Sequence, residues 1–262
     1  MKNELEMYLF AVKVNWNKWE YYSSHKVFRA VAVFARESSY YFLAYFILQV
    51  CGEIKGFDMA DCAVCLSLVN ISYGLYVLFF TGLRDFKVNE GYLDAFRLKP
   101  KGILTQALLS NVDWYATFGH VAIGGIVFVW GCVNASVVFT PIKALFFVIN
   151  ICGSVLIYAS VHILSAAVMV ASNGKYSLRS FLGAFVFGFI RFPICWFGRL
   201  FPYVLTYIFP IAFYSYYPAL QILDKETEMP QFFNYMSFPI GLSMYLVCYL
   251  IWRVVLVKKK IY

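Results

Sequence analysis

The sequence predicts an all-α integral membrane protein that crosses a bilayer about six times. Of its 262 residues, 62% are hydrophobic and only 14% are charged, whereas soluble domains are about half apolar and a quarter charged. A soluble domain of this length would lack the polar residues needed to cover its outside. The apolar residues also gather in runs of about twenty, the length that a spanning helix needs. Much of the surface must therefore face lipid.

Four runs are long and apolar enough to be spanning helices on their own evidence. They are residues 57–82, 114–139, 144–172 and 232–257. A further run, 39–52, is short, but extending it back through residues 30–34 gives a sufficient length that contains Arg36 and Glu37. We count it as the first span.

The apolar region 180–223 is too long for one crossing and too broken for two. We expect one full span near residues 180–196, followed by a re-entrant segment, 197–220, that enters and leaves on the outer side. Non-helical backbone at membrane depth is tolerated only where it is buried in protein or lines a cavity, so this segment is the candidate for the transport path. The interruptions are Arg191-Phe192-Pro193, Gly198-Arg199, Pro202, Pro210 and Pro218.

Basic residues set the expected orientation. Cytosolic segments are enriched in Lys and Arg, and placing the N-terminus in the cytosol puts all but a few of the 22 basic residues on that side. Both termini are then cytosolic and the number of crossings is even. The net charge of +8 does not indicate a nucleic-acid partner, because the basic residues do not cluster on one soluble face. The exceptions to the cytosolic set are Lys55, Lys143 and Lys225, with Arg191 and Arg199 unassigned.

The first residues, 1–26, predict an amphipathic helix that lies in the membrane interface. Apolar residues recur there at spacings of three and four, and two tryptophans would sit at headgroup depth. The alternative is that this helix packs against the bundle. No uninterrupted apolar core precedes a cleavage site, so we expect the start to be retained. The apolar positions are Leu5, Tyr8, Leu9, Val12, Trp16 and Trp19.

The chain lacks the common sequence signatures of catalysis. It contains no phosphate loop, H-E-x-x-H pair or G-x-S-x-G elbow, so we expect no catalytic residue. Cys62 and Cys65 have C-x-x-C spacing, but without a second pair they are more consistent with two helical residues one turn apart than with a metal site. No acidic residue lies deep in the four clear spans, which argues against an ion-coupled carrier built on a buried carboxylate.

The longest polar stretch between spans is the predicted cytosolic loop 83–113. Within it, residues 91–100 alternate apolar and charged positions at helical spacing and end at a proline, which predicts a short amphipathic helix. An ordinary solvated loop is the alternative.

Residues 91–100 closely resemble the G-x-L-D-x-x-L-x-K-P motif in one group of type-2 ATP-binding-cassette (ABC) transporter permeases. Gly91, Leu93, Asp94, Lys99 and Pro100 match, and Arg97 takes the place of an apolar residue. The stretches 191–193, 209–213 and 217–219 are similar to the R-[YF]-P, [VI]-P-x-A-F and Y-x-P-A patterns of the same group.

The resemblance implies the membrane-spanning half of a transporter, with re-entrant helices near the external gate. The coupling loop would dock on a separate ABC ATPase, present in two copies, which would hold ATP and Mg²⁺. A second permease chain, identical or homologous, would complete the path, and no cofactor or metal would bind this chain. An ion-coupled carrier or a channel is the runner-up, and a membrane enzyme comes third. The location implied is a bacterial inner membrane, and the implied gate residues are Arg191, Pro193, Arg199, Pro202, Pro210, Tyr214 and Pro218.

Overall fold

The computed structural model describes residues 23–84, 102–109, 113–178 and 187–259, with positions 6, 9, 10, 13 and 14. The predicted coupling element 91–100 and most of the predicted interfacial helix 1–26 lie outside these ranges. Within them every regular element is helical, apart from an isolated bridge between Ile54 and Phe57. The all-α prediction is confirmed for this part of the chain.

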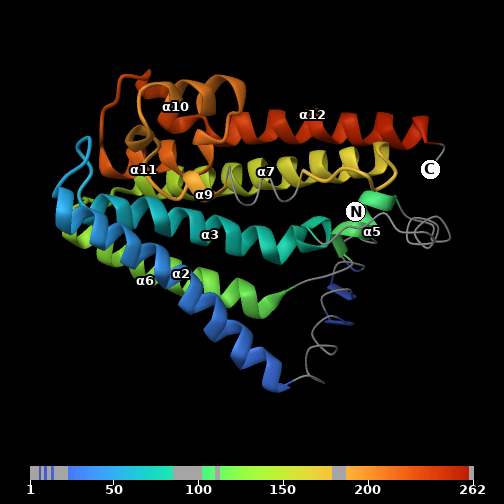
Figure 1. Ribbon diagram of the computed structural model, residues 1–262, viewed down its shortest axis with the longest axis horizontal. Helices are drawn as coiled ribbons and strands as arrows, with labels where there is room; N and C mark the ends of the chain where they lie inside the picture. The colour runs from blue at the N-terminus through green and yellow to red at the C-terminus, as the bar shows by residue number, and fades with distance from the viewer. Residues whose placement is uncertain are drawn as a thin grey trace.

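Long helices laid side by side form the body of the molecule (Figure 1). Four of them are long and apolar enough to cross a membrane, and they correspond to the four clear runs of the sequence. The pairs α3–α6 and α7–α12 have the most extensive contacts. The bounds are α2 (Ser23–Cys51), α3 (Met59–Arg84), α5 (Ile103–Leu109), α6 (Trp114–Asn134), α7 (Pro141–Ala171) and α12 (Ser237–Lys258).

Capping residues explain where two of these helices begin. The Asp113 side chain accepts a hydrogen bond from the backbone N–H of Ala116 at 3.1 Å, and Thr140 caps α7 in the same way. Such caps satisfy backbone donors that have no partner inside the helix. Pro141 follows Thr140 at the first helical position, where its missing N–H is not needed.

The region after α7 is broken into short pieces, and we call residues 187–223 the broken segment. Regular helix stops at Phe189, so the predicted span does not continue as one helix to Trp196. The proline of the Arg191-Phe192-Pro193 turn cannot extend a helix from the residues before it. The pieces are α9 (Phe187–Phe189), η2 (Ile194–Phe197), α10 (Leu200–Tyr203), η3 (Val204–Ile208), η4 (Ala212–Tyr214) and α11 (Tyr216–Leu223), with η5 (Gln231–Tyr235) preceding α12.

The last piece of the broken segment lies in the core. Residues 216–222 are all buried, and α11 packs against α3 and α7. Its backbone polar groups need partners there, which the helix supplies. This last piece of the broken segment is therefore part of the packed interior, whereas α10 has no buried residue.

The broken segment is fastened at two points to one end of the bundle. At the first point, the Trp196 Nε1–H donates to the carbonyl of Ile54, 3.0 Å away, in the turn between α2 and α3. At the second, just after the segment's last residue, Asp224 forms an ion pair with Lys143 in the first turn of α7. We call this end, where α2 passes into α3, the turn end.

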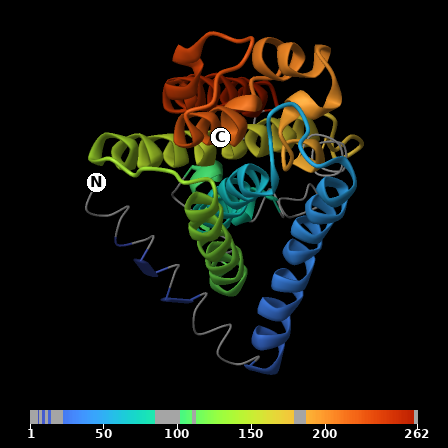
Figure 2. The same cartoon turned by 90° about the vertical axis from the view of Figure 1, so that its left-hand side faces the viewer.

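The opposite end holds α5 and the end of α12, whereas α2 begins at some distance from both (Figure 1). Ile103, Leu104 and Ala107 of α5 are buried there against α7 and α12, including Trp252. Seen from the turn end, α2 leans away from the other helices towards its start (Figure 2). The polar stretch 83–113 is therefore not solvated throughout, because its α5 portion belongs to the packed bundle.

Two glycines let α7 and α12 touch backbone to backbone. A methyl group added at Gly153 would overlap the backbone of Ser237 and Phe238, and one at Gly241 would overlap the carbonyl of Gly153. Small residues commonly allow such close approach in membrane helices.

We expect Gly153→Ala to lower the free energy of unfolding by about 1–3 kcal/mol, the usual effect of overpacking. Thermal unfolding of the purified protein in detergent measures the loss. Gly125→Ala is the matched control, since an added methyl there meets no atom within 4 Å. Equal melting temperatures for the two variants would contradict the close-packing assignment.

Candidate functional site

A buried ion pair joins the broken segment to the midpoint of α2. An Arg191 guanidinium nitrogen donates to Oε2 of Glu37 at 2.5 Å, and the Nε–H of Arg36 donates to the other carboxylate oxygen at 2.8 Å. The Glu37 side chain has no exposed surface. The Arg191 guanidinium also lies 4.0 Å from the centre of the Tyr40 ring, a cation–π contact. Both oxygens of this carboxylate are therefore engaged by arginines.

Polar side chains from α3 and α6 extend this pair into a network. Arg36 Nη2 lies 3.1 Å from Nε2 of His120, whose other ring nitrogen lies 3.4 Å from Oδ1 of Asn70. The Asn70 amide in turn donates to the Tyr41 hydroxyl at 2.8 Å. Three long helices and the broken segment thus meet at one set of hydrogen bonds.

Sequence reasoning placed Arg191 at the gate but missed its partner. The search for buried acids was confined to the four clear spans, and Glu37 lies in the first, less apolar one. Arg36 was grouped with the cytosolic cations, whereas the structure places it beside Glu37 in the middle of α2. Charged residues within membrane spans usually pair with one another. The presence of Arg191 was therefore a reason to look for an acidic partner in another span.

Backbone-directed hydrogen bonds hold the interior of the broken segment. The Tyr214 hydroxyl donates to the carbonyl of Val69 at 3.0 Å, and the Ser154 hydroxyl donates to the Tyr214 carbonyl at 2.6 Å. The Ser215 hydroxyl donates to the carbonyl of Ile190 at 2.9 Å. Tyr214, one of the predicted gate residues, therefore ties this segment to α3 and α7.

The prolines of the predicted gate set occupy positions where a missing donor is tolerated. Pro193 is buried and directly precedes η2, and Pro218 is buried in the first turn of α11. Pro210 separates η3 from η4. A backbone N–H in the first turn of a helix has no acceptor within that helix. Prolines at such positions therefore bend the chain without the loss of a hydrogen bond.

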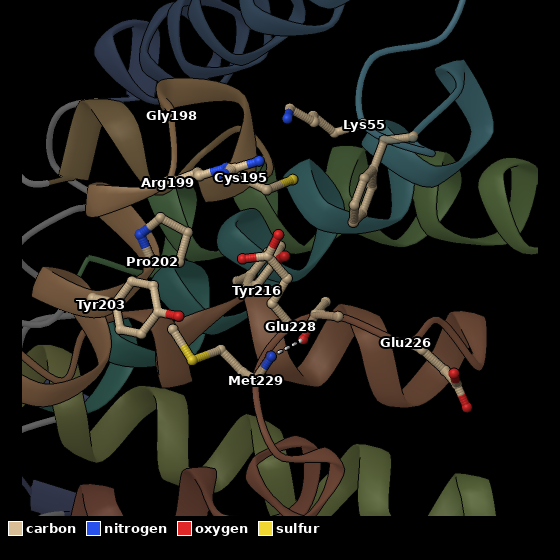
Figure 3. A pocket seen from close by; sticks show the side chains of 12 residues that line it. Lys55, Cys195, Gly198, Arg199, Pro202, Tyr203, Tyr216, Glu226, Glu228 and Met229 are labelled. Atoms are coloured by element: carbon tan, nitrogen blue, oxygen red, sulfur yellow. Dashed lines mark hydrogen bonds between the residues drawn. The ribbon is translucent and has the colours of Figure 1, made fainter.

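A cavity of about 170 Å³ opens at the turn end, beneath η2 and α10 (Figure 3). Arg199 and Pro202, both predicted gate residues, line it together with residues that sequence reasoning did not select. These come from the α2–α3 turn, from the chain after α11 and from the broken segment itself. They are Lys55 and Phe57 of the turn, Glu226, Thr227, Glu228 and Met229 after α11, and Cys195, Gly198, Tyr203 and Tyr216 of the broken segment.

A second set of ion contacts anchors the chain behind this cavity. The Lys225 ammonium contacts Oδ2 of Asp61 at 2.6 Å and also donates to the carbonyl of Gly56. Asp58 and Asp61 accept each other's backbone N–H at 2.9 Å. The start of α3 is therefore fixed to the chain that follows α11.

The gate assignment and the coupling assignment both stay predictions. Of the seven predicted gate residues, all of which belong to the broken segment by their numbers, Arg191 forms the ion pair and Arg199 and Pro202 line the cavity. Gly91, Leu93, Asp94, Arg97, Lys99 and Pro100 lie outside the described residues. In the described ranges no group of three or more His, Cys, Asp and Glu side chains is placed to hold a metal ion.

Comparison with known proteins gives one match. A family model described as ABC-2 family transporter protein matches residues 34–260. No curated protein and no solved structure matches the chain. The matched stretch takes in Glu37, the whole broken segment and most of α12.

We expect Glu37→Gln to lower the free energy of unfolding by about 3–5 kcal/mol, because it leaves the Arg191 charge buried without its carboxylate. Arg36→Gln should change it by about 1 kcal/mol or less, since that side chain is 54% exposed. Thermal unfolding in detergent gives both values.

The Glu37→Gln/Arg191→Gln double variant should lose less stability than the sum of the two single variants, the mark of a direct interaction. Strict additivity in this double-mutant cycle would show that the two side chains are not coupled.

Proposed function

Because the chain belongs to the ABC-2 transporter family, we propose that it is the permease half of an exporter powered by a separate ATPase. The family match over residues 34–260 carries this proposal. The sequence contains no phosphate loop of its own, so the energy of ATP would reach the chain as a mechanical push through the loop between α3 and α6.

The arrangement of the helix ends supports six crossings with both termini in the cytosol. Helices α2 and α6 begin, and α3 and α12 end, away from the turn end (Figure 1). The sequence near these helix ends is rich in Lys and Arg, as cytosolic segments are. The turn end is then external, and the region 180–196 supplies the fifth crossing. The broken segment, fastened to the turn end through Trp196 and Asp224, is the re-entrant gate.

We assign coupling to residues 91–100, with Gly91, Leu93, Asp94, Arg97, Lys99 and Pro100 in contact with the ATPase. The flanking helices offer a route for the push. On one side, α5 packs against α7 and α12. On the other, α3 and α6 carry Asn70 and His120, which reach the Glu37–Arg191 pair. A tilt of these helices would therefore displace the Glu37–Arg191 pair, near which the broken segment begins.

The complete machine would contain two permease chains, identical or homologous, and two ATPase subunits holding ATP and Mg²⁺. The substrate path would run between the permease chains in a bacterial inner membrane. Glu37 does not favour the alternative of an ion-coupled carrier, because both of its carboxylate oxygens are bound by arginines. A carboxylate held in this way is a structural link and a poor proton carrier.

The first test is co-purification from the native membrane. We expect the tagged full-length chain to bring down an ATPase with a phosphate loop, and consistent failure to do so would overturn the proposal.

With that complex in nanodiscs, Asp94→Ala/Lys99→Ala should reduce ATP hydrolysis by about tenfold, because a coupling contact contributes on the order of 1–3 kcal/mol. The melting temperature of the permease should not change. Lys175→Ala is the matched control, since Lys175 is an exposed cation just after α7, in another connection at the same end of the bundle. Hydrolysis at the original rate in the double variant would exclude this stretch as the coupling element.

A further inference from the structure

The cavity at the turn end presents two cations without an acidic partner. Lys55 and Arg199 both line it, and among the residues that the structure describes neither forms an ion pair or a side-chain hydrogen bond. Their neighbours Lys143 and Lys225 are both paired with aspartates. Two unpaired cations on one cavity wall favour an anionic ligand group, and arginine in particular matches the geometry of phosphate.

Two glutamates from the chain after α11, Glu226 and Glu228, line the same cavity. Figure 3 shows Glu228 rising from the chain after α11 towards the cavity, whereas Glu226 points away. Glu226 is engaged by the side-chain amide of Gln231 at 2.6 Å, and Glu228 forms no ion pair within the described ranges. The cavity, of about 170 Å³, is therefore lined by two cations and by a carboxylate without an ion-pair partner among the described residues.

Aromatic rings and a lipid-facing helix complete the surroundings. The inner wall is formed by Phe57 and Tyr216, both buried, with ring centres 6.1 Å apart. The Phe57 ring already has the Lys225 ammonium 5.0 Å from its centre. Tyr203 lies at the rim, and a tyrosine face next to a carboxylate suits an ammonium group. Just outside, α10 and η3 expose Leu200 at 73% and Ile208 at 66%. Such apolar surface beside a charged pocket is typical of headgroup depth in a bilayer.

We propose that this cavity binds a zwitterionic phosphate headgroup, the phosphate-plus-ammonium chemistry of phosphatidylethanolamine. The phosphate lies against Lys55 and Arg199, and the ammonium lies against Glu228 and the Tyr203 ring. The acyl chains run along the exposed face of α10 and η3. The lipid would bind to this chain alone. The proposal therefore holds or fails independently of the proposed export function and of the ATPase.

The test is native mass spectrometry of the purified, delipidated full-length chain, titrated with phosphatidylethanolamine or phosphatidylglycerol of the same acyl length. The unmodified chain should retain phosphatidylethanolamine in preference to phosphatidylglycerol. Arg199→Gln should weaken retention of both lipids by about tenfold, the loss of one charge-assisted hydrogen bond. Glu228→Gln should abolish the preference while keeping phosphatidylglycerol bound. Arg253→Gln, an exposed site near the far end of α12, is the control.

Soluble competitors distinguish recognition of the lipid headgroup from binding of free phosphate. Displacement of phosphatidylethanolamine by O-phosphoethanolamine, but not by inorganic phosphate, supports recognition of the zwitterionic headgroup. Equal displacement by inorganic phosphate would overturn the ammonium half of the proposal. Unchanged retention and preference in Arg199→Gln and Glu228→Gln, relative to Arg253→Gln, would overturn the site altogether.

Discussion

The buried pairing of Glu37 with Arg191 is the interaction on which the rest of the structure depends. Removing two charges from water is expensive, and further contacts offset part of that cost. Arg36 donates a hydrogen bond to the Glu37 carboxylate, and the Tyr40 ring makes a cation–π contact with the Arg191 guanidinium. The position of α2 is thereby tied to the turn at which the broken segment begins. Because an unpaired charge at this depth is so unfavourable, α2 and the broken segment must move together or keep this contact as a pivot.

The broken segment shows how irregular backbone can persist inside an apolar bundle. Every polar backbone group there needs a partner in the protein, since lipid offers none. Tyr214, Ser154 and Ser215 meet that need at η4, and regular helix meets it along α11. The aromatic side chains of this region thus divide into two groups. Tyr214, Tyr216 and Tyr217 fill the core, whereas Tyr203 and Tyr207 face outwards.

Much of the fold could be predicted from the sequence, because spanning helices are long and uniformly apolar. The runs at 114–139 and 144–172 were placed within a few residues of α6 and α7. Where the apolar signal was interrupted, prediction was weaker: prolines marked the broken segment, but its path through the core depends on contacts distant in the chain. The same holds for the site. Arg191 and Arg199 could be selected locally, whereas Glu37, Lys55 and Glu228 become neighbours only through the fold.

The anchors of the broken segment differ in how strongly they hold. At the turn end, the Lys143–Asp224 pair has an aspartate that is 72% exposed, and pairs in contact with water contribute about 1 kcal/mol or less. The Glu37 carboxylate is fully buried, and breaking such a pair costs several times more. Beside the Lys143–Asp224 pair, the Lys225–Asp61 pair has an aspartate side chain that is only 6% exposed, and it holds the same end of the segment. Loss of the Lys143–Asp224 pair alone would therefore leave the outer end of the broken segment attached, through Lys225 and through the buried residues of α11.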